Sequence, residues 1–159
     1  MATDPGRLID ALVGGGVEFV VIGGVALVLH GSARTTGDLD VCYSRLRHNL
    51  AALEHALAPL HPTLRGAPSE LPFRLDVATL RAGLNFTLST EAGDIDLLGE
   101  VAGVGGFADV ARDAVTMELH GHPVRVMSLD TLERAKRASG RRRDLLDLAE
   151  ILEIRRRRS

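Results

Sequence analysis

The sequence predicts an α+β fold, in which helices flank a mixed β-sheet and a short helical part forms the C-terminus. In the first half of the chain, helical patterns alternate with short runs typical of buried strands. Two pairs of strand-like runs follow, each around a turn signal, and two helical patterns come last.

The first elements have clear boundaries. Asp4 before Pro5 starts a helix, because Asp can cap the helix and proline suits its first turn. Residues 19–22 read as a buried strand, and a short helix over residues 25–30 follows a double glycine. Residues 38–43 are expected to form the second strand.

A longer helix is expected over residues 46–58, where leucines recur at helical spacing and Pro59 ends the pattern. Residues 61–72 have no clear period, so we expect a loop that could act as a lid. Residues 76–82 are compatible with a short helix.

Two hairpins are expected in the second half, each with a turn between alternating runs. The elements expected there are strands 85–89 and 94–98, a glycine-rich loop 101–106, a helix 107–114, and strands 116–120 and 123–127.

Two helices should complete the chain. Ser128 caps a helix over residues 131–138, and Gly140 breaks it. The apolar face of the last helix is expected at Leu145, Leu148, Ala149 and Leu152. We expect a single domain with a core over residues 1–127 and a helical segment over residues 128–159 packed on it.

Composition restricts the class of protein. The chain has 159 residues, of which 45% are hydrophobic, and this is enough for one globular core. The net charge of −2 does not indicate a general polyanion binder. Arginines concentrate at residues 141–143 and 155–158, either as a solvated helix face with a frayed tail or as a phosphate or RNA contact.

The chain is expected to be cytoplasmic. Its single cysteine, Cys42, cannot form a disulfide within the chain and reads as a small core residue rather than a nucleophile. The N-terminus lacks the layout of a signal peptide. The apolar run over residues 17–29 is interrupted by glycines and is shorter than the roughly 20 residues of a membrane helix.

The chemistry is expected near Gly23, Gly24, Asp38 and Asp40. A glycine turn that opens a helix is a common phosphate site. Asp38 and Asp40 share one face of a strand, where two carboxylates repel each other unless a cation lies between them. Oxygen ligands of this kind suit Mg²⁺, so phosphate and metal together suggest nucleotide chemistry.

Asp94 and Asp96 repeat the alternation of acids and apolar residues. If their strand lies beside Asp38 and Asp40, one of them completes a three-carboxylate cluster. Asp96 is the better candidate because it lies well inside the strand, whereas Asp94 is nearer the turn and exposed to solvent. Three carboxylates can hold two Mg²⁺ ions, and the third can also accept a proton from an attacking hydroxyl.

These motifs resemble the minimal nucleotidyltransferase fold of the DNA polymerase β superfamily. The segment GGVALVLHGSARTTGDLD resembles the small prokaryotic branch that includes abortive-infection and toxin–antitoxin nucleotidyltransferases. The C-terminal segment LERAKRASGRRRDLLDL resembles a Lys–Arg–Asp–Asp pattern of that branch. By position this pattern corresponds to Lys136, Arg141, Asp144 and Asp147.

The resemblance implies a Mg²⁺-dependent transfer of a nucleoside monophosphate from an NTP to an acceptor hydroxyl. Asp38, Asp40 and Asp96 would be the catalytic and metal-binding residues, with two ions expected. The nucleotide would be bound by Gly23, Gly24, Arg34 and Lys136, although Arg34 and Lys136 could equally be solvated side chains.

The acceptor is open at this stage. The resemblance favours tRNA or protein, with a possible role as the toxin of a toxin–antitoxin pair and an antitoxin partner. A small-molecule (antibiotic) nucleotidyltransferase and a non-catalytic nucleotide-binding module are the alternatives. His30, on a short apolar helix, is expected to be structural.

Overall fold

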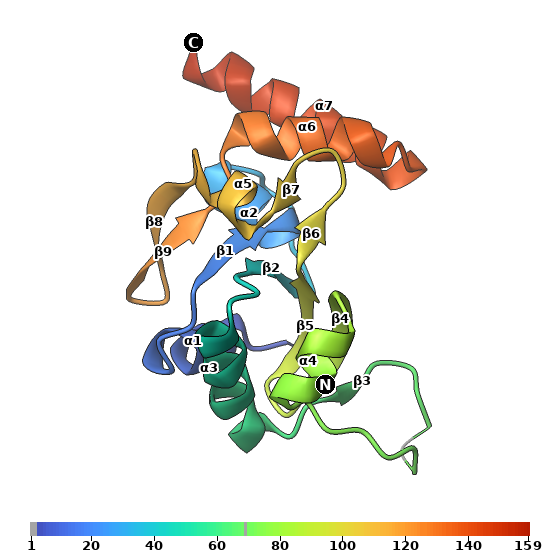
Figure 1. The fold of residues 1–159 in the computed structure, drawn as a ribbon. Helices are drawn as coiled ribbons and strands as arrows, with labels where there is room; N and C mark the ends of the chain where they lie inside the picture. Colours follow the sequence, from blue (N-terminus) through green and yellow to red (C-terminus); the bar gives the residue numbers. More distant parts are fainter. Residues whose placement is uncertain (1–2, 69) are drawn as a thin grey trace.

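A mixed seven-stranded sheet organises the molecule, in the order β3-β4-β5-β2-β1-β9-β8 (Figure 1). The structure is a computed structural model and describes residues 3–68 and 70–159. The strands are β1 (Phe19–Ile22), β2 (Leu39–Tyr43), β3 (Thr63–Leu64), β4 (Asn85–Thr90), β5 (Gly93–Leu98), β8 (Val115–Leu119) and β9 (His122–Val126). A separate small ribbon pairs β6 (Glu100–Val101) with β7 (Gly105–Gly106).

The centre of the sheet combines both strand orientations. β2 runs antiparallel to β1 but parallel to β5, and β1 runs parallel to β9. Short turns join the antiparallel hairpins β4–β5 and β8–β9, as the sequence predicts. The longer connection from β2 to β5 permits their parallel pairing. The α+β prediction with a mixed sheet is therefore confirmed.

The helices lie in two groups about the sheet (Figure 1). α1, α3 and α4 gather near one side, and α2, α5, α6 and α7 lie toward the other. The helices are α1 (Pro5–Gly14), α2 (Gly23–His30), α3 (Arg47–Leu57), the 3-10 turn η1 (Ala58–Leu60), α4 (Val77–Ala82), α5 (Phe107–Ala111), α6 (Leu129–Ser139) and α7 (Arg142–Arg158).

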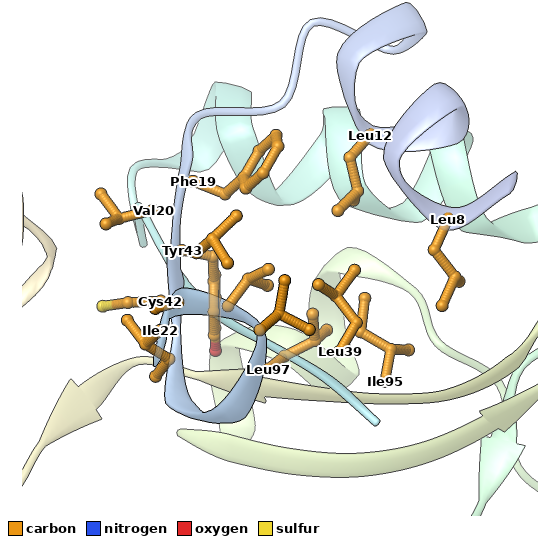
Figure 2. Packing of buried hydrophobic residues seen from close by; sticks show 14 of the residues in the cluster. Leu8, Leu12, Phe19, Val20, Ile22, Leu39, Cys42, Tyr43, Ile95 and Leu97 are labelled. Carbon is orange, nitrogen blue, oxygen red and sulfur yellow. The ribbon is translucent and has the colours of Figure 1, made fainter. Parts of the chain in front are cut away.

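Aliphatic side chains from both halves of the chain form the core (Figure 2). Leu8 and Leu12 of α1 face Leu39 of β2 and Ile95 of β5, and all four are fully buried. Cys42 is also buried, and burial raises the pKa of its thiol to about 12, which agrees with a packing role. Leu39 and Ile95 fix the face that β2 and β5 turn to the core, so their acids turn to the other face.

The segment expected to be a loop over residues 61–72 contains a short strand. β3 pairs with β4 through Thr63↔Ser89 and Leu64↔Leu88. Residues 101–106, also expected to be a loop, contribute to the β6–β7 ribbon. Both strand pairs are two residues long, which is too short to produce a recognisable sequence period.

The last helix presents a different face to the core from the one predicted. Leu145 and Leu152 are 63% and 57% exposed, whereas Ile151 and Ile154 are buried. Asp144 and Asp147 lie on the buried face as well. The expectation of an apolar face through Leu145 and Leu152 is therefore wrong.

The arginines at residues 155–158 are helical and do not form a frayed tail, because α7 continues to Arg158. Arg155 pairs with Asp130 of α6, and Arg158 donates a hydrogen bond to the His30 carbonyl oxygen at 2.9 Å. No helix in the described part of the chain is long and apolar enough to cross a membrane.

Candidate active site

The predicted acids meet on one face of the paired strands β2 and β5. Asp40 lies opposite Asp96 in the parallel register, one position after Leu39↔Ile95. Asp38 immediately precedes β2. The expectation that the two acidic segments lie side by side is confirmed, and it holds because the apolar neighbours of both acids are drawn into the same core.

Asp40 is the most strongly perturbed of these acids. Burial, followed by the charge of Asp96, a hydrogen bond with Asp96 and the charge of Asp38, raises its pKa to about 7. Its Oδ1 atom is buried, and no hydrogen-bond partner for it exists among the described residues. An unpaired buried carboxylate oxygen is costly, so this atom is a candidate ligand for a cation.

Gly23 is required by the close approach of Asp40. Its φ is +65°, a conformation that favours glycine, and an added Cβ would lie 2.3 Å from Asp40 Oδ2. At Gly24 an added Cβ would lie 2.7 Å from Thr36 Oγ1. The two glycines therefore let the loop before β2 pack directly against the start of α2.

Lys136 lies close to the acids but is not free. Its Nζ is 2.8 Å from Asp147 Oδ2 and 3.4 Å from Asp144 Oδ1. Arg34 pairs with the other oxygen of Asp147 and lies 3.8 Å from Glu150. Asp147 thus joins the predicted nucleotide-binding residues Arg34 and Lys136, which come from different parts of the chain.

Asp144 is fully buried and paired. Burial opposes its ionisation, but hydrogen bonds from Arg141 and the charge of Lys136 outweigh this and lower its pKa. Arg141 donates to Asp144 Oδ2 from its backbone at 3.0 Å and from its side chain at 3.1 Å. The Lys–Arg–Asp–Asp segment therefore forms one contiguous ionic network.

Two cavities adjoin this cluster. A cavity of about 250 Å³ is lined by Gly23, Asp40, Asp96 and Lys136, with apolar walls from β5, β6 and α6. A second, of about 240 Å³, is lined by Gly24, Arg34, Asp38 and Leu146, among others. Arg143 lines both cavities, as do Asp40 and Lys136. Within its arginine run, no local pattern distinguishes Arg143 from its neighbours.

Arg65 is the main residue of the site that sequence reasoning missed. Its Nη2 lies 2.7 Å from Asp96 Oδ1, its Nε 3.3 Å from Asp94 Oδ2, and its Nη1 3.8 Å from Asp38 Oδ2. Asp94 is 36% exposed, as its place near the turn predicts, and it also pairs with this guanidinium. An isolated arginine in an aperiodic segment carries no signal for such a position.

His30 has a structural role, as expected. Its Nε2 lies 2.8 Å from the Met127 carbonyl oxygen, and Arg158 approaches its Nδ1 at 3.3 Å. Burial lowers the pKa of the imidazole, so the neutral ring donates from Nε2 and accepts at Nδ1. The side chain ties α2 to the residue that follows β9 and to α7.

The donor set fits a hard divalent cation. Asp38, Asp40 and Asp96 offer only carboxylate oxygens, which Mg²⁺ prefers, and Asp40 Oδ1 lacks a partner in the described chain. However, within residues 3–68 and 70–159 no three His, Cys, Asp or Glu side chains are arranged to hold a metal ion. Arg65 contacts two of the three acids instead.

Two solved structures share this architecture over nearly the whole chain. The lincosamide antibiotic adenylyltransferase LnuA, bound to lincomycin, is 14% identical with a TM-score of 0.60, and the match covers 96% of this chain and 98% of LnuA. A Thermotoga maritima protein provisionally described as a nucleotidyltransferase is 17% identical with a TM-score of 0.58, and the match covers 95% of each chain. No protein-family model and no curated protein sequence matches the chain. At these identities the likeness concerns the fold, and the chain therefore has the nucleotidyltransferase fold.

Proposed function

We propose that the protein transfers a nucleoside monophosphate from an NTP to an acceptor hydroxyl with the help of a divalent metal. The observation that carries this proposal is the register Asp40↔Asp96 beside Gly23. Such an arrangement places oxygen ligands next to a helix start, where unpaired backbone N–H groups favour phosphate.

Asp38, Asp40 and Asp96 would hold Mg²⁺, with two ions expected. Bound Mg²⁺ would supply Lewis-acid neutralisation of charge at the phosphates. Asp96 would accept the proton of the acceptor hydroxyl. The acceptor oxygen would then bond to the α-phosphorus, and the bond from that phosphorus to the leaving pyrophosphate would break.

Gly23 and Gly24 would let the triphosphate approach the backbone at the start of α2. Lys136 would add a positive charge, since an ammonium has three donors and its two aspartate contacts leave one for phosphate. Arg34 would contribute from the facing loop, while Asp147 fixes its orientation. Arg143, which lines both cavities, is a further candidate for this role.

The surface next to Asp96 favours a small acceptor. On the neighbouring strand β4, Thr87 lies opposite Asp96, and Ser89 lies opposite Asp94 and donates to it at 3.0 Å. Arg65 is already paired with acids there. Hydroxyls and carboxylates suit a small hydroxylated or amine-bearing molecule better than a polyphosphate chain. LnuA, which shares the fold, is an enzyme that acts on an antibiotic.

Acceptors of tRNA or protein, and a toxin role with an antitoxin, are the rival assignments. The arginines that suggested RNA are largely used within the chain: Arg155, Arg157 and Arg158 contact α6 and the end of α2. This removes part of the reason for preferring RNA.

The test is incubation with each α-labelled NTP and Mg²⁺ in the presence of hydroxylated antibiotics, total RNA or lysate protein. We expect pyrophosphate release and label in the small-molecule fraction, and Asp40→Asn should lower turnover by roughly 10³-fold. Glu118→Gln on exposed β8 is the matched control. Wild-type turnover in Asp40→Asn would contradict the assignment, and NTP binding without pyrophosphate release would indicate a binding module.

A further inference from the structure

A side chain of the protein itself, Arg65, supplies a positive charge beside Asp38, Asp94 and Asp96. Arg65 directly follows β3, and its backbone N–H donates to the Thr87 carbonyl oxygen at 3.0 Å, which extends the pairing with β4. This anchored backbone points the guanidinium across β4 toward β5. Its position is therefore fixed by the sheet rather than by the loop that follows.

The contacts of the guanidinium are all with acceptors. It donates hydrogen bonds to Asp96 and to the carbonyl oxygens of Leu88 at 2.9 Å and Ile95 at 3.4 Å. Its contacts with Asp94 and Asp38 are ion pairs. The side chain is only 28% exposed. A planar guanidinium suits such a multiple contact, because its five donors form a rigid fork.

Asp40 lies outside this set of contacts. Its buried Oδ1 atom finds no partner in the described chain, although Asp96 beside it is paired with Arg65. Within the cluster, Asp96 is thus neutralised by Arg65, whereas Asp40 has no such contact with the guanidinium.

We propose that Arg65 is the resident counter-ion of the metal-free site and competes with the divalent metal for Asp96 and Asp38. The inference rests on the proposed function, because it assumes that these acids bind the metal. A guanidinium and a divalent cation repel each other when both approach the same carboxylate. Arg65 therefore opposes metal binding at Asp96 as long as it holds the Oδ1 atom of that carboxylate.

This competition has two opposite consequences. In the metal-free protein, Arg65 relieves the repulsion between Asp38, Asp94 and Asp96 and so stabilises the fold. For the same reason it weakens metal binding, because the metal must compete with a cation that already neutralises these carboxylates. A residue that only bound phosphate or acceptor would have neither effect in the absence of those ligands.

The experiment measures Mn²⁺ binding to the full chain without nucleotide, by electron paramagnetic resonance, together with thermal unfolding in EDTA. Arg65→Gln should tighten Mn²⁺ binding roughly tenfold and lower the melting temperature of the metal-free protein. Arg65→Lys, which keeps the charge but loses the fork, should tighten binding by a smaller factor and guards against a folding failure of the first variant.

Arg74→Gln is the control for simple loss of charge, since Arg74 is 83% exposed and lies near Asp76 rather than the cluster. It should change the Mn²⁺ affinity less than about twofold. Unchanged or weaker Mn²⁺ binding in both Arg65 variants, with binding in the wild type, would overturn the counter-ion role alone. Absence of Mn²⁺ binding in the wild type and in every variant would overturn the metal site itself, and with it this inference.

Discussion

Asp40 and Asp96 lie opposite each other on adjacent parallel strands, and Asp40 has a pKa of about 7 because burial and the charge of Asp96 oppose its ionisation. An acid whose pKa is higher in the folded chain than in the unfolded chain binds its proton more tightly when folded. Its ionisation therefore favours unfolding. The loss of stability should begin as pH rises above about 4 and be complete above about 7.

Asp40→Asn should remove this loss. In metal-free buffer, the variant should gain on the order of 1–3 kcal/mol in the free energy of unfolding relative to wild type at pH 8, and much less at pH 4. Urea denaturation at both pH values measures the difference. The exposed Glu118→Gln should show no such pH-dependent gain, and an equal effect of Asp40→Asn at both pH values would contradict the raised pKa.

Gly23→Ala should disturb both the turn and the site. The new Cβ would meet Asp40 Oδ2 at 2.3 Å in a backbone conformation that alanine rarely adopts. We expect a loss of about 1–3 kcal/mol in stability and a fall in turnover. Gly14→Ala is the matched control, because its φ is ordinary and the added Cβ meets no described atom within 4 Å. Equal stabilities of the two variants, by chemical denaturation, would refute the requirement for glycine.

Neighbouring residues on α7 test the face that this helix buries. Ile151→Ala should cost about 2–4 kcal/mol, since Ile151 is fully buried in the core. Leu152→Ala should stay within about 0.5 kcal/mol, because that side chain is mostly exposed. Thermal or urea unfolding separates these values. The reverse ranking would support the face predicted from the sequence.

Asp147→Asn should be more damaging than a change of an exposed acid on the same helix. Asp147 is buried between Arg34 and Lys136, so its neutralisation leaves two cations poorly compensated. We expect a loss of about 2–4 kcal/mol. Glu153→Gln, which removes an exposed partner of Arg156, should leave the stability nearly unchanged because solvent screens this pair. Comparable losses in the two variants would show that the network is not stabilising.

The central part of the fold and its acids could be read from the sequence because strong local patterns determine them. Strand 19–22 is a continuous apolar run between turn signals, and the alternation around Asp40 and Asp96 assigns the acids to one face. The pairing of the two strands that carry Asp40 and Asp96 required only that both apolar faces share a core. The structure satisfies that condition through Leu39 and Ile95.

Arg65 and the orientation of α7 could not be predicted, for different reasons. β3 is two residues long, so the position of Arg65 depends on tertiary pairing with β4. On α7 the leucines predict the buried face because they are the more hydrophobic residues. In the structure, Asp144 and Asp147 instead contact Lys136, and the face that they share with Ile151 and Ile154 is the buried one. Long-range ion pairs of this kind leave no periodic signal in the sequence.

The shared contact of Asp147 with Arg34 and Lys136 also limits how the chain can be recombined. A chimera that joined this sheet to the last helix of another protein would have to supply a carboxylate at this one place. Without that carboxylate, Arg34 and Lys136 would repel each other in a partly closed space, even if the backbones of the two proteins joined without strain. Successful grafts should therefore exchange the loop before β2, α6 and α7 as a single unit.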